Sequence, residues 1–146
     1  MTDLENKILA ALREKNKQMD EYDAHCKAEA DKSMKEAEEI RAAGGEHAEF
    51  WYADKKHDAE WHLGFQHHGY EFVEEWCNVI ASVMYGRVYH EWHSACPGRH
   101  GTGHGGYSSS ELTSDERKNV HKVFNGLIKH GYLRQSKSGY KAKLVK

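Results

Sequence analysis

The first forty residues place apolar side chains at three- and four-residue steps in a background of Glu, Lys and Asp. The positions are Leu4, Ile8, Leu12, Met19, Tyr22, Cys26, Ala30, Met34, Ala37 and Ile40. This is the period of an α-helix, and Gly44 and Gly45 supply a stop, so we expect one helix over residues 2–43. Its apolar stripe is narrow, and the helix therefore needs a partner surface. We favour an arm that dimerises as a coiled coil or antiparallel hairpin; the alternative is a helix folded back on its own chain.

Two further stretches have helical patterns. Residues 46–66 carry aromatic side chains among His and acidic residues, and Gly69 marks the end of this second helix. The aromatic residues are Phe50, Trp51, Trp61 and Phe65. From Tyr70 to about Trp92 the chain is at its most hydrophobic, and we expect the core helix there. Its broad stripe consists of Phe72, Val73, Trp76, Ile80, Val83, Met84 and Val88. Because these aromatics alternate with apolar rather than basic residues, the pattern favours packing over base stacking.

The last forty residues contain two helix-start signals. Segments 108–111 and 113–116 each form a capping box, in which Ser or Thr is followed three residues later by Glu. We therefore expect a short helix over about Ser109–Leu112, a turn, and a long helix over about Ser114–His130, with Gly131 as its stop. The apolar stripe of the long helix is Val120, Val123, Phe124, Leu127 and Ile128.

Two short alternating segments follow the long helix. Residues 132–135 and 140–144 have the period of strands, and the Ser-Lys-Ser-Gly segment 136–139 joins them. The glycine in this segment adopts positive φ easily, which suits a tight turn. The pattern predicts a β-hairpin.

Charge is divided unevenly along the chain. Residues 107–146 hold nine Lys/Arg against three Asp/Glu, net +6, in a chain whose total is −2, so the preceding 106 residues carry −8. The polar residues of the long helix lie off its apolar stripe, and basic residues continue along the hairpin. They are Arg117, Lys118, His121, Lys122 and Asn125 on the helix and Arg134, Lys137, Lys141 and Lys143 on the hairpin. A basic end of this kind favours nucleic acid as a partner.

The order of these signals, in the run SSSELTSDERKNVHKVFNGLIKHGYLRQSKSGYKAKL, resembles the winged helix-turn-helix family of DNA-binding domains. The resemblance covers about the last quarter of the chain. It implies that the helix over 114–130 enters the major groove of duplex DNA and that the hairpin, the wing, touches the backbone or the minor groove. It also implies a transcriptional or accessory regulator that binds DNA as a homodimer. Residues 4–15 or residues 70–92 could serve as the first helix of such a domain, and the pattern leaves both open.

The predicted fold class is mainly α, with long N-terminal helices and a C-terminal winged helix-turn-helix that includes a small β-hairpin. We expect a helical arm over residues 1–68, a core helix and a Gly/His-rich loop over 69–106, and the winged module over 107–146. No apolar run approaches the roughly 20 residues that cross a bilayer, and the N-terminus has no signal pattern, so we expect a cytoplasmic protein without membrane contact. Three cysteines with no CxxC pair are expected to be reduced thiols.

The loop over residues 91–106 contains a possible set of metal ligands. His93, Cys96, His100 and His104 supply the imidazole and thiolate donors that zinc accepts in a tetrahedral site. Their spacing is shorter than that of a zinc finger, and we favour a solvated Gly/His linker over a zinc site. No catalytic motif or nucleophile-base pair is present, so we expect no enzymatic activity and no required cofactor.

A second class of function fits the same charge division. The acidic −8 portion could dock onto the basic face of a nucleic-acid-processing enzyme, and the protein would then be an inhibitor or adaptor with the winged helix as a structural unit. The sequence does not identify the DNA site or the protein partner.

Overall fold

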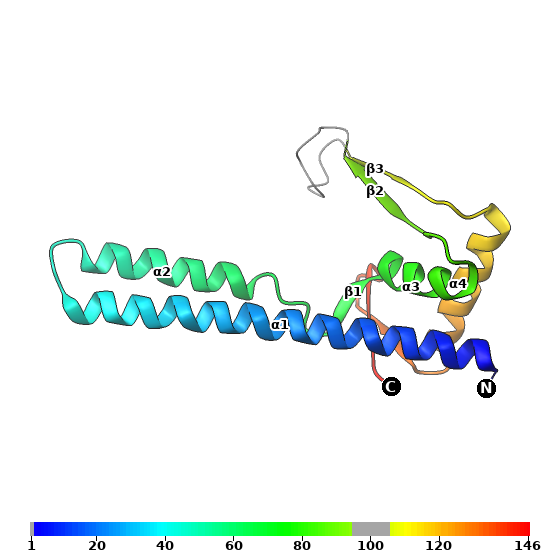
Figure 1. Ribbon diagram of the computed structural model, residues 1–146, viewed down its shortest axis with the longest axis horizontal. Helices are drawn as coiled ribbons and strands as arrows, with labels where there is room; N and C mark the ends of the chain where they lie inside the picture. The colour runs from blue at the N-terminus through cyan, green and yellow to red at the C-terminus, as the bar shows by residue number, and fades with distance from the viewer. Residues whose placement is uncertain (1, 95–105) are drawn as a thin grey trace. The chain divides into compact units, whose positions relative to one another are not determined.

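The computed structural model describes residues 2–94 and 106–146. Over these residues the protein is mainly helical, with four helices and five short strands (Figure 1). In chain order the elements are α1 (Asp3–Ala43), α2 (Ala48–Leu63), β1 (Tyr70–Phe72), α3 (Val73–Tyr85), β2 (Glu91–Ser94), β3 (Gly106–Ser109), α4 (Ser114–Lys129), β4 (Leu133–Gln135) and β5 (Lys141–Leu144). The chain forms two compact units. We call Met1–Asn16 with Tyr70–Lys146 the sheet unit, and Lys17–Gly69 the arm unit.

The arm unit is a helical hairpin made of the later part of α1 and α2 (Figure 1). Gly44 and Gly45 both have positive φ in the turn between the helices, a conformation that favours glycine. The buried side chains are mostly small, and they are Met19, Cys26, Ala30, Ala37 and Ala59. Small side chains let the two helices approach closely, and an ion pair of 3.2 Å between Lys55 Nζ and Glu36 Oε2 links them at the surface.

Asp23 holds the turn that follows α2. Its carboxylate accepts hydrogen bonds from the backbone N–H groups of His67 at 2.7 Å and His68 at 2.8 Å. The side-chain amide of Gln66 donates to the backbone carbonyl of Asp23 at 2.9 Å. His68 and Gly69 both have positive φ, so these bonds stabilise a turn with a conformation that is costly for a non-glycine residue.

The sheet unit contains a three-stranded antiparallel sheet with the order β1-β5-β4. Leu133 of β4 and Ala142 and Leu144 of β5 are buried on one face of this sheet. The Trp76 indole N–H of α3 donates to the Ala142 carbonyl at 2.9 Å. The core of the unit consists of Ile8, Leu9, Leu12, Trp76, Cys77, Ile80, Ala81, Val120, Phe124, Leu133, Ala142 and Leu144. The first turns of α1, the helices α3 and α4 and the sheet therefore share one core.

Most of the predicted elements are confirmed. The helices expected over residues 2–43, 46–66 and 114–130 are α1, α2 and α4, and the expected hairpin is β4 and β5. The predicted core helix over 70–92 is too long, because its first three residues form β1 and pair with β5. At its other end Gly86, with φ of 66°, terminates α3.

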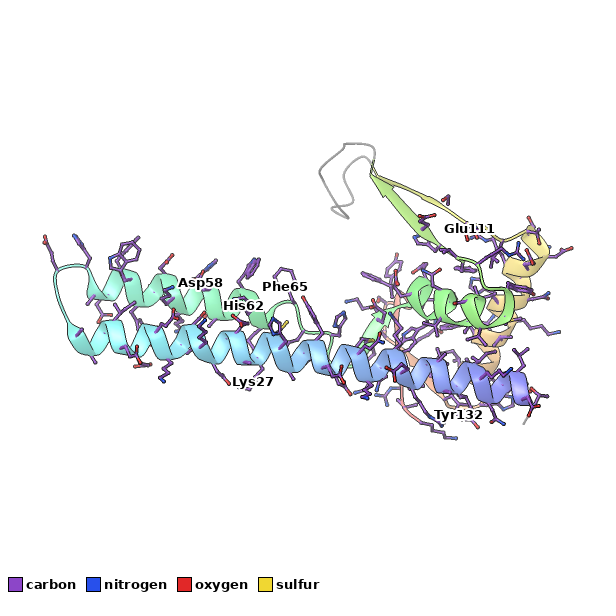
Figure 2. The ribbon with its side chains drawn as sticks, viewed as in Figure 1. Lys27, Asp58, His62, Phe65, Glu111 and Tyr132 are labelled. Carbon is purple, nitrogen blue, oxygen red and sulfur yellow. The ribbon has the colours of Figure 1, made fainter. Side chains whose placement is uncertain are left out.

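The predicted short helix over Ser109–Leu112 is wrong. Residues 106–109 form β3, which pairs antiparallel with β2. Both ends of the segment expected to be a loop, residues 91–106, therefore belong to paired strands. The Glu111 carboxylate, labelled in Figure 2, accepts from the Val88 N–H at 3.0 Å, and the Glu111 N–H donates to the Val88 carbonyl at 3.1 Å. A long-range partner for Glu111 thus replaces the expected local cap.

Candidate nucleic-acid interface

Helix α4 starts at the second predicted capping box. The Glu116 N–H donates to the Thr113 hydroxyl at 3.2 Å, and the Thr113 N–H donates to the Glu116 carboxylate at 2.9 Å. The helix buries Val120 and Phe124 in the core. Its opposite face therefore points to solvent. The helix residues predicted to contact DNA are all exposed on that face, and they are Arg117, Lys118, His121, Lys122 and Asn125.

These five residues line one open hollow. Together with Ser114 and Tyr89 they border a shallow hollow of about 690 Å³ that is widely open to solvent. Four of the lining side chains can donate hydrogen bonds as cations or imidazole groups, and Asn125 can both donate and accept. The five residues predicted from the sequence on the helix are thus brought together at one place.

Tyr89 forms the buried wall of the hollow and is not among the residues predicted from the sequence. Its side chain is 5% exposed. The Arg117 guanidinium carbon lies 5.0 Å from the centre of the Tyr89 ring, and the His121 ring meets it edge-on with 5.8 Å between ring centres. Burial raises the pKa of the Tyr89 phenol above its usual value, so the ring is a neutral support for both side chains. No local sequence signal identifies this role, because Tyr89 is distant in sequence from α4.

The start of α4 is also tied to the end of α3. The Arg87 guanidinium pairs with the Glu116 carboxylate, and the Asn119 amide donates to the Tyr85 hydroxyl at 3.2 Å. The hydrogen bond from the Thr113 backbone, with the Arg87 pair in addition, lowers the pKa of the Glu116 carboxyl. The carboxylate is therefore ionised at neutral pH and holds Arg87 next to the first turn of α4.

Three of the hairpin residues lie on the sheet face opposite the core. Arg134 stands directly across from Lys143, which stands across from Tyr70 on the other side. The Lys143 ammonium is 5.7 Å from the Tyr70 ring centre, and the Lys141 ammonium is 4.9 Å from the ring centre of Phe72. Two like charges directly opposite each other on a sheet repel, and a bound anion between them would remove that cost.

Lys137, the remaining predicted contact, is exposed between β4 and β5. The structure therefore groups the nine predicted residues as five in the α4 hollow, three on the outer sheet face and one in the hairpin turn. Tyr70 and Phe72 join the second group. The local sequence pattern predicts a helix for both, because their place on a strand beside Lys141 and Lys143 depends on pairing with β5.

The predicted metal ligands are only partly within the described residues. His93 lies in β2, in register with Tyr107 of β3. The other three, Cys96, His100 and His104, lie outside the described residues. Over residues 2–94 and 106–146, no group of three or more His, Cys, Asp or Glu side chains is placed to hold a metal ion. The zinc site stays a prediction.

Comparison with protein-family models, with curated proteins and with solved structures gives no match to this chain. Among the helices within the described part of the chain, none combines the length and the apolar character needed to cross a membrane.

Proposed function

We propose that this protein is a cytoplasmic winged helix-turn-helix protein that binds duplex DNA as a dimeric transcriptional or accessory regulator, with α4 as its recognition helix. The hollow on α4 carries the proposal. It presents three exposed cationic side chains, one imidazole and one amide on one face of a helix whose opposite face is buried. Arginine, lysine and asparagine are the side chains that read guanine and adenine edges in the major groove.

The arrangement of the sheet unit supports the same proposal. Residues 4–15 of α1 belong to the unit that contains α3, α4 and the β4–β5 hairpin, which favours them as the first helix of a winged domain. In this proposal the hairpin is the wing. Its outer face carries the Arg134 and Lys143 pair, whose mutual repulsion a phosphate group would relieve.

Titration of a fluorescent duplex tests the proposal. We expect Arg117→Ala and Lys122→Ala each to cost about 1–3 kcal/mol of binding free energy on a preferred duplex. Each variant should therefore reduce the difference in affinity between the preferred duplex and random DNA. Lys129→Ala is the matched control, because it removes a charge from the last turn of α4 outside the hollow. If the parent does not bind duplex DNA, or if all three variants bind as the parent does, α4 is not a recognition helix.

A second candidate function has support from the arm unit. Residues 17–69 hold seven Lys/Arg against thirteen Asp/Glu, net −6, and expose several aromatic side chains. Such a surface could dock onto the basic face of a nucleic-acid-processing enzyme. Charge reversal in the arm unit would then abolish the protein's inhibition or recruitment of that enzyme in cells, whereas variants of α4 would not.

A further inference from the structure

Helix α2 and the residues just after it expose several large apolar side chains. Of the ten large hydrophobic side chains that are exposed within the described residues, five lie between positions 50 and 65. They are Phe50, Trp51, Trp61, Leu63 and Phe65, of which Figure 2 labels Phe65 just after α2. Trp61 is 57% exposed and Phe50 is 65% exposed. A concentration of this kind within one short segment is typical of an interaction surface.

The outward side chains of α2 follow the period of a coiled-coil seam. Phe50, Asp54, His57 and Trp61 are all exposed and are spaced four, three and four residues apart. The inward side chains, Tyr52, Lys55, Ala59 and His62, are partly or fully buried. Alternating steps of three and four residues place the first set in one line along the helix, on the side opposite the second set. The helix therefore has a second seam besides the one that packs in the arm unit.

The composition of this seam is complementary to itself in one orientation. In an antiparallel pair of α2 helices related by a two-fold axis between residues 55 and 56, Phe50 meets Trp61 of the second copy. In the same register Asp54 meets His57 of the second copy. A parallel pair would instead place Asp54 on Asp54 and His57 on His57. Antiparallel pairing thus joins aromatic to aromatic and acid to imidazole at all four positions.

We propose that two copies of this chain associate through antiparallel pairing of their α2 helices, along the seam Phe50, Asp54, His57 and Trp61. This inference rests on the dimeric form in the proposed function, but it requires no contact with DNA. Phe50 and Trp61, the two aromatic residues of one seam, lie roughly 16 Å apart along the helix, about the length of three helical turns. So short a seam gives an interface at the small end of stable complexes, and the dimer should dissociate at micromolar concentrations.

The charges of α2 favour a second copy over a membrane surface as the occupant of this seam. The helix holds four Asp/Glu against two Lys. Helices that lie on anionic membranes carry Lys and Arg beside their apolar face, and an acidic helix would be repelled. The imidazole of His57 instead has a carboxylate partner available on an identical helix.

Sedimentation of the full chain over a concentration series tests the association. We expect a concentration-dependent dimer, and we expect the double variant Phe50→Ala with Trp61→Ala to raise its dissociation constant at least about tenfold. Both side chains are more than half exposed, so the helical content by circular dichroism should not change. Glu39→Lys is the control for charge, because it reverses an exposed carboxylate on α1 away from the seam.

A mixing experiment tests the register. Asp54→Lys replaces the carboxylate opposite His57 with an ammonium group at both sites of its own dimer, and His57→Asp places two acidic pairs, so each variant alone should dimerise less than the parent. In a mixed dimer of the two variants, the new lysine faces the new aspartate at one site and the native Asp54–His57 pair remains at the other. Native mass spectrometry should therefore find mixed dimers above the statistical proportion.

Three results would overturn the proposal. The first is a parent chain that sediments as a monomer at every concentration. The second is a dimer that persists in the double variant and mixes at random in the charge variants. The third is a monomeric parent that binds anionic lipid vesicles through Trp61, which would assign the seam to a membrane. None of these results depends on DNA binding, so failure here is separate from failure of the proposed function.

Discussion

At the scale of single residues, burial next to the α4 hollow makes the Cys77 thiol unreactive. Burial, with the nearby charge of Glu74 in addition, raises the pKa of the Cys77 thiol to about 12. The thiolate is the nucleophile in alkylation, and it is nearly absent in the folded protein at neutral pH. Cys77 therefore acts as a packing residue between α3 and α4.

The first prediction concerns Cys77. We expect iodoacetamide to modify Cys77 far more slowly in the native protein than in the same chain unfolded in urea, because both burial and the raised pKa withhold the thiolate. Peptide mass spectrometry after timed quenching measures the two rates. Equal rates in the folded and unfolded chains would show that the thiol is accessible and that α3 does not pack as described.

Asp23 is the residue on which the turn after α2 depends. Burial acts to raise the pKa of its carboxyl, but hydrogen bonds from the His67 and His68 backbone and from the His67 ring outweigh it, and the net pKa is lowered. A carboxyl whose pKa is lower in the folded state stabilises the protein above its unfolded pKa of about 4. That contribution is lost as the pH falls through the native pKa.

The second prediction follows from this sign. We expect Asp23→Asn to lower the free energy of unfolding at pH 7, and we expect the difference from the parent to shrink as the pH falls below about 4. Urea unfolding over a pH series measures the difference. Asp20→Asn is the matched control, because Asp20 is an exposed carboxylate on the same helix. A difference that is constant with pH would mean that the carboxylate charge is not what holds the turn.

At the scale of elements, the three-stranded sheet carries a charge arrangement that opposes its own stability. Arg134 of β4 and Lys143 of β5 are directly opposite each other on the solvent face. Like charges in this position destabilise strand pairing. An arrangement that costs stability in the free protein is expected where the two charges share an anionic ligand.

The third prediction separates stability from binding at this pair. Arg134→Gln should leave the free energy of unfolding unchanged or raise it by a few tenths of a kcal/mol, and it should weaken binding to all duplex sequences alike. Chemical denaturation and duplex titration measure the two effects. Lys137→Gln removes a charge from the hairpin turn, where the sheet register gives it no opposite residue, and it should weaken binding without the gain in stability. A loss of stability in Arg134→Gln would contradict the repulsion.

At the scale of the whole molecule, the two compact units have opposite charge. The sheet unit holds fourteen Lys/Arg against ten Asp/Glu, net +4, whereas the arm unit is −6. The net charge of −2 is therefore the sum of a basic unit and an acidic unit, and only the basic unit has the sign of charge that the proposed DNA binding requires. Binding through the sheet unit should be strongly sensitive to salt.

The fourth prediction is this salt dependence. The logarithm of the affinity for non-specific duplex should fall linearly with the logarithm of salt concentration, with a slope of about −0.9 for each phosphate contacted. Lys141→Ala and Lys143→Ala should each reduce the slope by about 1. Fluorescence anisotropy at several salt concentrations measures it. A flat response would remove phosphate contact as the source of affinity.

Much of the secondary structure could be predicted from local signals. The Thr113 to Glu116 capping box and Gly131 mark the ends of α4 within one residue of the prediction, and the glycine pair Gly44 and Gly45 follows the last residue of α1. These signals succeed because capping and apolar period act within a few residues of the chain. The five helix residues of the candidate interface were found for the same reason, since the outward face of α4 follows directly from its buried stripe.

Elements that depend on distant partners could not be predicted in this way. Residues 70–72 have an apolar pattern that suits a helix, yet they form β1 because β5, about seventy residues later, offers a free edge. Glu111 stands at a cap position, yet its carboxylate bonds to the Val88 backbone. Long-range pairing outweighs a local preference of a few tenths of a kcal/mol per residue.

The sequence by itself determined the helices α1, α2 and α4, the hairpin of β4 and β5, the division of charge and the outward face of α4, because each of these depends on local spacing or composition. Only the tertiary structure decided that residues 4–15 join α4 in one unit, that Tyr89 supports Arg117 and His121, and that Arg134 faces Lys143. These are contacts between segments far apart in the chain. They are formed by burial of a shared core and by strand register, and neither leaves a pattern within a short stretch of sequence.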